Sequence, residues 1–345
     1  MPNLEENCVG DYNRPNLTMR CYSICRRTPR KYAVLFALVC LILVLWFNFL
    51  QNGWTVDIEK QETATLAPGV DNYIRSLSES FSSETEFVSS KKSPRILCLI
   101  LTVEENIETR ARVVNNTWLK RCNLHYFVLR TENRSLDVIN TPFGETRQNI
   151  VRKVWFAFRY IYDYHLNDFD WLLKADDDTY VIVENLRKLL ETEKSTKPSY
   201  LGFHFNKFIR SGYMSGGAGY VISRRALTQF FEIGIKNGLC PILQNEDDPE
   251  NSEDIETGQC LNISGVSVIN SLDDEGRERF HPYPVDRHAF GWLPEYVFEW
   301  SKHKQRQGPE CCSRYSVSFH YMEPHAMLLI DHLLYRTSVY GFTGH

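Results

Sequence analysis

The pattern of apolar and polar residues changes sharply at Arg95. Before it, residues 51–93 are rich in Ser, Thr, Glu and Lys and show little apolar periodicity, which is typical of a solvated stem. Ile96–Leu101 is then an unbroken apolar run, the pattern of a strand buried on both faces. We therefore expect a folded domain over residues 94–345.

Strand and helix patterns alternate through the first half of this domain. A surface helix is predicted over Glu105–Arg121 and a second strand over Tyr126–Leu129. An amphipathic helix follows over Thr146–His165, and a third strand begins at Trp171. This alternation predicts a nucleotide-binding α/β fold with a parallel sheet.

A second apolar run lies near the N-terminus. Residues 32–50 contain one strongly polar side chain, Asn48, and are long enough to span the hydrocarbon core of a bilayer. The run ends in bulky aromatic residues without a small-residue cleavage site, which favours an uncleaved anchor over a signal peptide. Basic residues before the run predict a cytoplasmic tail over residues 1–31 and a luminal remainder, including the stem at 51–93.

Composition fits a packed domain and argues against one class of partner. The chain has 345 residues, of which 43% are hydrophobic, and a formal net charge of −4. No long basic stripe crosses the globular part, so we expect no nucleic-acid partner.

The cysteines indicate an oxidising compartment. Of the ten in the chain, an even set follows the predicted anchor, namely Cys98, Cys122, Cys240, Cys260, Cys311 and Cys312. We expect three disulfides among them, with the pairing left open. Zinc binding is the alternative, but these cysteines contain no C-x-x-C pair, and adjacent Cys311 and Cys312 suit a tetrahedral site poorly. Three glycosylation sequons, at Asn115, Asn133 and Asn262, also lie on the predicted luminal side.

Three carboxylates, Asp176, Asp177 and Asp178, directly follow the strand that begins at Trp171. Such a concentration of negative charge favours a hard cation such as Mg²⁺ or Mn²⁺. A solvated acidic turn or a helix cap is the alternative, but apolar strand residues on both sides favour the metal site. A cation here would stabilise a departing nucleotide diphosphate, which predicts transfer from a nucleotide donor.

Three later segments carry further candidate chemistry. The glycine-rich stretch Ser211–Tyr220 would let backbone approach a ligand, and its tyrosines offer flat surfaces to a sugar. Asp254 is a candidate general base, although Glu-Asp pairs commonly cap helices or are solvated. His320 could complete a carboxylate metal site, although a buried, hydrogen-bonded histidine is the commoner case.

Taken together, these segments resemble the core 1 β1,3-galactosyltransferases, Golgi enzymes related to the fringe glycosyltransferases. The resemblance runs from about Arg95 to Tyr340. The motifs that carry it are Lys174–Val181, Gly212–Val221, Glu253-Asp254 with Gly258 and Cys260, Phe280–Pro282, Gly308–Ser313 and Val317–Tyr321.

The resemblance implies a GT-A fold with a Rossmann-like mixed sheet. It also implies an inverting transfer of galactose from UDP-galactose to the 3-hydroxyl of N-acetylgalactosamine α-linked to Ser or Thr of glycoprotein acceptors. The protein would be a single-pass type II protein of the Golgi membrane with a luminal catalytic domain. A homodimer and a dedicated chaperone are the protein partners that the resemblance suggests.

The resemblance also implies roles for individual residues. Mn²⁺, with Mg²⁺ as the alternative, would be bound by Asp176, Asp178 and His320, and Asp254 would be the catalytic base. The donor-binding positions would be Asp176, Asp177, Thr102, Arg147 and Lys153. The acceptor-binding positions would be Trp300, Tyr213, Gly216 and Gly217.

The chain departs from the family at Arg152, at Val297–Trp300 and in the acidic expansion Gln244–Glu250. Two alternatives follow. One is a fringe-like β1,3-glycosyltransferase with another donor or acceptor, which the double cysteine and the Gly212–Val221 motif disfavour. The other is a non-catalytic chaperone of such an enzyme, which the retention of Asp176, His320 and Asp254 disfavours.

Overall fold

The computed structural model describes residues 71, 73–75, 93–133, 135–240 and 252–340. The predicted tail at 1–31, the anchor at 32–50, most of the stem and the acidic expansion lie outside the described residues. Among the helices in the described ranges, none is long and apolar enough to cross a membrane. Within the predicted stem, Ile74 is buried in the core.

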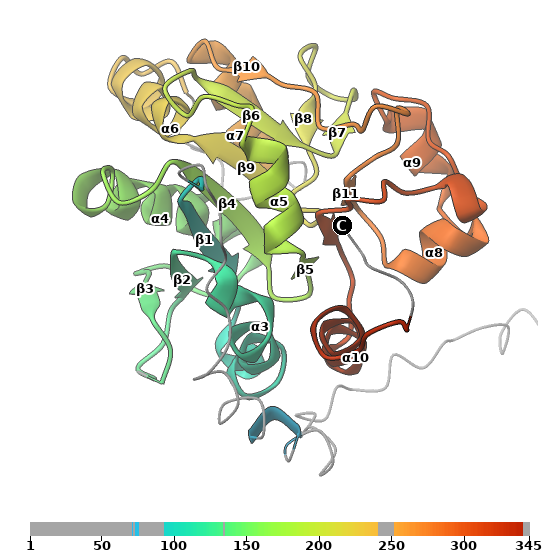
Figure 1. Cartoon of the computed structure of the whole chain (residues 1–345). Helices are drawn as coiled ribbons and strands as arrows, with labels where there is room; N and C mark the ends of the chain where they lie inside the picture. Colours follow the sequence, from blue (N-terminus) through green and yellow to red (C-terminus); the bar gives the residue numbers. More distant parts are fainter. Residues whose placement is uncertain (1–70, 72, 76–92, 134, 241–251, 341–345) are drawn as a thin grey trace, which may run out of the picture. The chain divides into compact units, whose positions relative to one another are not determined.

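A seven-stranded sheet forms the centre of the domain, with strand order β10-β6-β9-β4-β1-β2-β3 (Figure 1). Its strands are β1 (Ile96–Leu101), β2 (Leu124–Leu129), β3 (Val138–Asn140), β4 (Trp171–Asp176), β6 (Ser199–Gly202), β9 (Tyr220–Ser223) and β10 (Ser267–Val268). The three predicted strands correspond to β1, β2 and β4, and β1 has the predicted bounds.

The sheet is mixed rather than fully parallel. Strands β1, β2, β3 and β4 pair in parallel, whereas β9 runs antiparallel to both β4 and β6. The parallel sheet predicted from the alternation of elements was therefore wrong in this half, and the mixed sheet implied by the resemblance is confirmed. The apolar pattern of Tyr220–Ser223 does not indicate the direction of β9, because this strand is buried on both faces and would be equally apolar in either direction.

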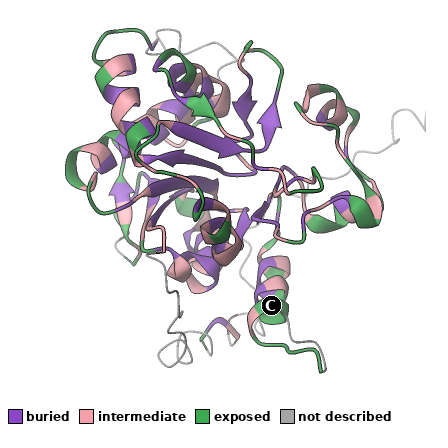
Figure 2. Cartoon of the chain, turned by 45° about the horizontal axis from the view of Figure 1, so that its top comes forward, coloured by how far each residue is buried: buried purple, intermediate pink, exposed green. Residues whose placement is uncertain are grey.

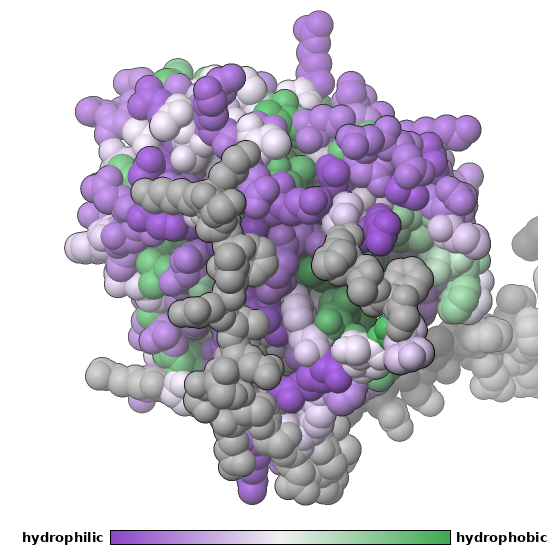
Figure 3. Space-filling view, viewed as in Figure 1, coloured by the Kyte–Doolittle hydropathy of each residue, from purple (hydrophilic) through white to green (hydrophobic). Residues whose placement is uncertain are grey.

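Helices cover both faces of the sheet, so its strands lie buried between two apolar layers (Figure 2). One face packs on α4 (Ile150–Tyr164), α6 (Arg224–Gln229) and α7 (Glu253–Ile263). The other packs on α3 (Arg112–Asn116), α5 (Val183–Leu190) and α10 (Pro324–Tyr335). Hydrophilic residues cover most of the described face shown in Figure 3.

The helix predicted over Glu105–Arg121 is broken into four short pieces. A 3₁₀ turn at Glu104–Asn106 leads into a π-helical turn at Ile107–Ala111, then α3, then a 3₁₀ turn at Trp118–Arg121. Thr117 leaves the helical conformation, and its hydroxyl donates back to the carbonyl oxygen of Val113 at 2.8 Å. A side chain that bonds its own preceding turn in this way competes with the helix, which explains why α3 ends at Asn116.

A smaller sheet and a hairpin lie beside the main sheet. The small sheet has the order β11-β12-β5, from β11 (Phe280–His281), β12 (Ser318–Phe319) and β5 (Tyr180–Val181). The pairing of β12 with β5 brings His320, the residue after β12, beside the Asp176–Asp178 segment. The hairpin is β7 (His204–Phe205) with β8 (Tyr213–Met214), and α8 (Val285–Phe290) and α9 (Glu295–Trp300) complete the domain.

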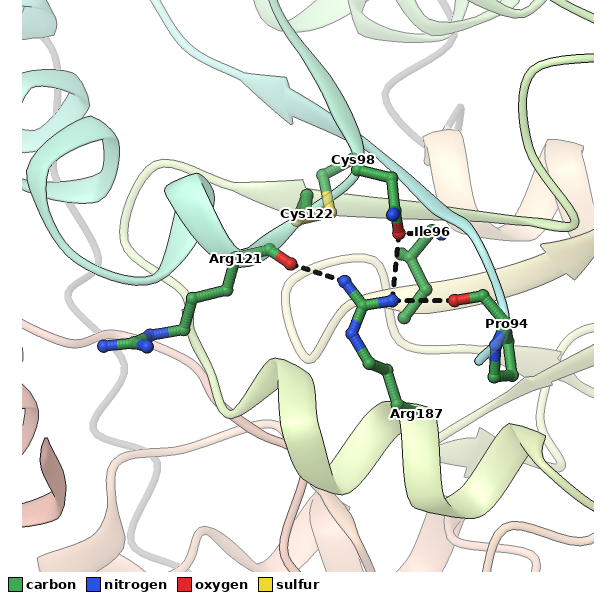
Figure 4. Close-up of a disulfide and its surroundings, with 7 residues drawn as sticks. Pro94, Ile96, Cys98, Arg121, Cys122 and Arg187 are labelled. Carbon is green, nitrogen blue, oxygen red and sulfur yellow. Dashed lines mark hydrogen bonds between the residues drawn. A yellow bond between two sulfur atoms is a disulfide. The ribbon is translucent and has the colours of Figure 1, made fainter. Parts of the chain in front are cut away.

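The six cysteines form three disulfides, as predicted. They pair as Cys98–Cys122, Cys240–Cys260 and Cys311–Cys312. Beside the first disulfide, Arg187 on α5 donates to the carbonyl oxygens of Pro94 at 2.7 Å and of Arg121 at 2.6 Å (Figure 4). These two hydrogen bonds connect α5 to the segments that precede β1 and β2.

Removing the Cys240–Cys260 disulfide is expected to lower the free energy of unfolding by about 3 kcal/mol, because it closes a loop with a sequence separation of 20. The Cys240→Ser/Cys260→Ser variant would be compared with wild type by urea denaturation. Cys311→Ser/Cys312→Ser is the matched control, since that bond joins neighbouring residues and restricts the unfolded chain little. Equal losses in the two double variants would contradict this expectation.

Candidate active site

A cleft of about 1060 Å³ opens where β1 and β4 end. Thr102 directly follows β1, and the register pairs Leu101 with Asp176, so both segments reach the same edge of the sheet. The carboxyl ends of strands are the usual ligand-binding edge of an open α/β sheet. The volume is at the upper end of the range for ligand sites, so it can hold a ligand larger than a single sugar.

Asp176, Asp178 and His320, the three predicted metal ligands, meet at this cleft. One ligand atom from each lies within 4.8 Å of the other two. The Nε2 atom of His320 is 3.2 Å from Oδ1 of Asp178 and 4.0 Å from Oδ2 of Asp176. Burial would raise the pKa of Asp178, but His320 and Arg110 outweigh it and hold the pKa below its ordinary value. Asp178 is therefore a ready anionic ligand at neutral pH.

Asp177 points away from these ligand atoms. Its Oδ2 accepts hydrogen bonds from Thr102 Oγ1 at 2.6 Å and from Asn106 Nδ2 at 2.9 Å. Burial raises the pKa of Asp177 to about 6, despite these two donors. Asp176 and Asp178 therefore lie with His320. Asp177 instead connects the end of β4 to the segment after β1 through its hydrogen bonds.

Lys174 is buried inside β4 and connects the two sides of the cleft. Its Nζ lies 2.7 Å from Oδ1 of Asp176 and 3.5 Å from Oε2 of Glu253, and it donates to the carbonyl oxygen of Gly216. Burial alone would lower its pKa, but the carboxylates of Asp176 and Glu253 hold it above the ordinary value. A fully charged lysine therefore links the candidate metal ligands to the segment that carries Asp254.

Asp254 lies in the first turn of α7 and lines the cleft. Its Oδ2 accepts from the backbone N–H of Gly216 at 3.0 Å, and its Oδ1 accepts from the N–H of Ile255 at 3.0 Å. Burial, followed by the charge of neighbouring Glu253, raises the pKa of Asp254 to about 6. A carboxylate with this pKa is ionised at neutral pH yet more basic than an ordinary aspartate, as a general base requires.

The predicted acceptor residues form another wall of the cleft. Trp300 and Tyr213 line it together with Tyr296, Phe205 and Phe208. The rings pack on one another, with centroids 4.9 Å apart for Tyr296–Trp300 and 5.1 Å apart for Phe208–Trp300. Such aromatic surfaces suit the C–H faces of a sugar. Gly216 and Gly217 also line the cleft, beside the Asp254 and His320 side chains respectively.

The predicted donor residues lie on the side of the cleft formed by the β1 edge and α4. Lys153 is 2% exposed and donates to the carbonyl oxygen of Thr102 and to the carboxylate of Glu145. Thr102 is itself bonded to Asp177. Arg147 lines the cleft at the start of the segment that leads into α4. In the structure Thr102 and Lys153 therefore build the wall, and Arg147 presents a guanidinium to the cleft.

Gly217→Ala is expected to displace the His320 ring, because an added Cβ would lie 1.9 Å from its Cε1. We expect Mn²⁺ affinity to fall by at least about tenfold, in line with the effect of disturbing groups that orient metal ligands. Isothermal titration with Mn²⁺ would measure it. Gly144→Ala is the control, since there the added Cβ meets only the Asn149 amide at 3.8 Å. Equal affinities for the two variants would show that Gly217 does not position His320.

Several residues of the site had no predicted role. Glu253 accepts from the Tyr220 hydroxyl at 2.6 Å and the Thr257 hydroxyl at 2.8 Å, which holds it beside Lys174. Arg110 has an Nη1 atom 3.8 Å from Oδ2 of Asp178. The sequence carried a signal for Lys174, because a lysine within a strand buried on both faces requires a charged partner.

The glycosylation sequons differ in exposure. Asn133 and Asn262 are exposed, whereas Asn115 is half-buried on α3. The Thr117 hydroxyl of the Asn115 sequon is buried. Occupancy of all three sequons remains a prediction.

The chain matches a family model and is similar to known glycosyltransferases. The Fringe-like family model matches residues 91–273. The chain is 37% identical over 255 residues to glycoprotein-N-acetylgalactosamine 3-beta-galactosyltransferase 1 of Xenopus laevis, covering 73% of this chain and 69% of the relative. It is 24% identical to the beta-1,3-glucosyltransferase of Mus musculus over 52% of this chain and 36% of that protein.

Among solved structures, galactosyltransferase LgtC with donor and acceptor sugar analogs matches with a TM-score of 0.40 and 12% identity, over 71% of this chain and 98% of that chain. This likeness is too low to carry an argument. The identity to the Xenopus protein extends over most of both chains. The chain belongs to the Fringe-like family and, within it, to the glycosyltransferase family of the glycoprotein-N-acetylgalactosamine 3-beta-galactosyltransferases.

Proposed function

We propose that the chain is an inverting glycosyltransferase with a GT-A fold that moves galactose from UDP-galactose to the 3-hydroxyl of N-acetylgalactosamine α-linked to Ser or Thr. The observation that carries the proposal is the shared cleft. A metal-ligand set, a carboxylate with a raised pKa and an aromatic wall all line one cavity at the carboxyl edge of the sheet. The 37% identity to a protein named for this reaction supports the choice of donor and acceptor.

The donor set at the cleft suits Mn²⁺, with Mg²⁺ as the alternative. Two carboxylates and one imidazole offer mainly hard oxygen ligands with a single nitrogen, a combination common for Mn²⁺. Asp176, Asp178 and His320 would hold the ion. When bound, it would supply positive charge to offset the charge that develops on the UDP diphosphate.

The chain's own residues would perform the remaining work. Asp254 would accept the proton of the acceptor 3-hydroxyl as that oxygen forms a bond to C1 of galactose and the bond from C1 to the diphosphate oxygen breaks. Attack on the face opposite the leaving group inverts the configuration at C1. Lys174 links Asp176 to Glu253 and would thereby fix the positions of the donor and acceptor sides of the cleft relative to each other.

The acid limb of the kcat/KM profile is expected near pH 6. Asp254 must be ionised to accept a proton, and its pKa is raised to about 6, so transfer falls as pH drops through that value. Glu253→Gln removes a charge that raises the pKa of Asp254, and the limb should move to lower pH. Asp177 titrates in the same range, but Glu253 is not among the causes of its shift. A limb unmoved in Glu253→Gln would remove Asp254 as its source.

We also propose that the protein is anchored in the Golgi membrane as a single-pass type II protein, with the cleft in the lumen. The apolar run at 32–50 and the disulfides support this placement. Protease protection of the described domain in sealed Golgi vesicles would test it. Neither the comparisons nor the described residues support a homodimer or a chaperone partner, and we propose neither.

A donor and acceptor panel tests the proposed function. The full chain, purified in detergent, would be assayed with UDP-galactose, UDP-glucose and UDP-N-acetylglucosamine against GalNAc-α-Ser and O-fucose peptides, with Mn²⁺ present. We expect transfer only from UDP-galactose to the GalNAc peptide, with a β1,3 linkage by NMR and no product in EDTA. Preference for another donor or for the fucose peptide would establish the fringe-like alternative. No transfer by a chain that binds UDP would favour the chaperone.

A further inference from the structure

A second group of potential metal ligands lies away from the cleft, where β11 meets α8 at the right of Figure 1. It consists of His281 on β11, His288 on α8 and Cys312. One ring nitrogen of each histidine and the Cys312 sulfur lie within 4.8 Å of one another. Both histidines are almost completely buried, at 0% and 1% exposure. Two imidazoles and one sulfur form a different donor set from the carboxylate-rich cleft.

Each histidine keeps one ring nitrogen without a partner. Nδ1 of His281 and Nε2 of His288 make no hydrogen bond to any atom in the described ranges. A buried polar atom left unsatisfied costs about 1–3 kcal/mol, and most such atoms in folded proteins have a partner. Two such nitrogens in one cluster with the Cys312 sulfur call for an explanation.

The hydrogen bonds around His281 determine its tautomer. The Ser316 hydroxyl donates to the carbonyl oxygen of Ser313 at 2.7 Å, so its oxygen can only accept from His281 Nε2, 3.0 Å away. The proton is therefore on Nε2, and Nδ1 carries a buried lone pair. A histidine held through one nitrogen with the other left bare is the arrangement seen for metal-ligating histidines.

The Cys311–Cys312 disulfide contributes little to stability. It joins adjacent residues, whereas the other two disulfides have sequence separations of 24 and 20. Because the stabilisation by a disulfide grows with the loop it closes, this bond restricts the unfolded chain very little. A role for this disulfide therefore has to come from its redox chemistry rather than from its effect on stability.

We propose that His281, His288 and Cys312 form a second metal site, which takes a borderline-soft divalent cation such as Zn²⁺ when Cys311 and Cys312 are reduced. A dithiol reductant would transfer two electrons and two protons to the disulfide, giving two thiols and becoming a disulfide itself. Cys312 then loses its proton to solvent as the cation binds. Two imidazoles and a thiolate favour Zn²⁺ over Mn²⁺.

The group is connected to the cleft through β12 and His320. The carbonyl oxygen of His281 accepts from the backbone N–H of His320 at 3.1 Å, and the His281 ring stacks on Phe319 with centroids 4.5 Å apart. The second site would therefore hold the strand that carries a ligand of the first. Its existence is independent of the proposed transfer activity.

Two single variants distinguish a metal site from a pair of histidines that only pack against each other. Cys311→Ser and Cys312→Ser both remove the disulfide, but only Cys311→Ser keeps the Cys312 sulfur. The probe is Co²⁺, added to the full chain without reductant and followed by the near-ultraviolet absorption of a thiolate–cobalt bond. We expect this absorption to be stronger in Cys311→Ser than in Cys312→Ser, because the four cysteines before residue 51 are common to both variants. Adding His281→Gln to Cys311→Ser should weaken cobalt binding at least about tenfold, whereas exposed His325→Gln should not.

The wild-type chain provides a second measurement, which does not depend on the folding of any cysteine variant. Oxidised wild type should show no more thiolate–cobalt absorption than Cys312→Ser, and reduction by a dithiol should increase it and raise the Tm in Zn²⁺. Asp178→Asn should keep the absorption, which separates this site from the cleft. Absorption that is not increased by reduction, or that is equal in Cys311→Ser and Cys312→Ser, would overturn the proposal.

Discussion

Replacing Asp254 with asparagine is expected to lower kcat by about 10²–10⁴-fold, the usual contribution of a general base. Asparagine keeps the shape of the side chain and can still accept from the N–H of Gly216, so the fold and the cleft should persist. It cannot take up the acceptor proton. The affinity for UDP-galactose should therefore remain close to that of wild type, and the loss should appear in kcat. Steady-state kinetics with the GalNAc-α-Ser peptide would measure both quantities.

Asp137→Asn is the matched control for this variant. Asp137 is exposed at the other side of the sheet, beside β3, and the same charge is removed without touching the cleft. Its kinetics should equal those of wild type. If Asp254→Asn retained more than a tenth of wild-type kcat, Asp254 would not be the base and another carboxylate would have to serve.

Replacing Asp178 with asparagine is expected to abolish most transfer at ordinary Mn²⁺ concentrations. This variant removes one anionic ligand and the negative charge beside His320 Nε2. Metal ions commonly contribute several kcal/mol to transition-state stabilisation, so we expect a loss of at least about a hundredfold. Titration with Mn²⁺ should show weaker binding, with part of the activity regained at high metal concentration.

Asp177→Asn is the informative comparison, since its carboxylate faces Thr102 and Asn106 rather than His320. It should weaken Mn²⁺ binding clearly less than Asp178→Asn, while its effect on stability should be larger. A greater loss of metal affinity in Asp177→Asn would mean that the ligand set had been assigned to the wrong aspartates.

Local patterns were sufficient for the buried strands. The run Ile96–Leu101 is apolar at every position because both faces of β1 are covered, and Trp171 begins β4 in the same way. The antiparallel direction of β9 could not be read in this manner, because a strand buried on both faces has the same apolar pattern in either direction. The broken helix before β2 depended on the conformation of one threonine, Thr117.

Only part of the candidate active site could be predicted from the sequence. Asp176 and Asp178 are two residues apart in the chain, and their charge and apolar flanks predicted a cation site. His320 reaches them only through the pairing of β12 with β5. No local pattern contains that pairing, so this residue depended on the family resemblance. The connection from Asp176 through Lys174 to Glu253 is likewise long-range, and the sequence showed only its separate parts.

Locating Mn²⁺ in the protein is the most direct test of the central claim, that this cleft holds the cation and the nucleotide diphosphate beside Asp254. Crystals of the protein would be soaked with UDP and Mn²⁺ and the metal found by anomalous scattering. We predict one strong peak between Asp178 and His320, in contact with the UDP phosphates, and its disappearance in Asp178→Asn. A cleft without metal or nucleotide, with Lys174 still neutralising Asp176, would contradict the account.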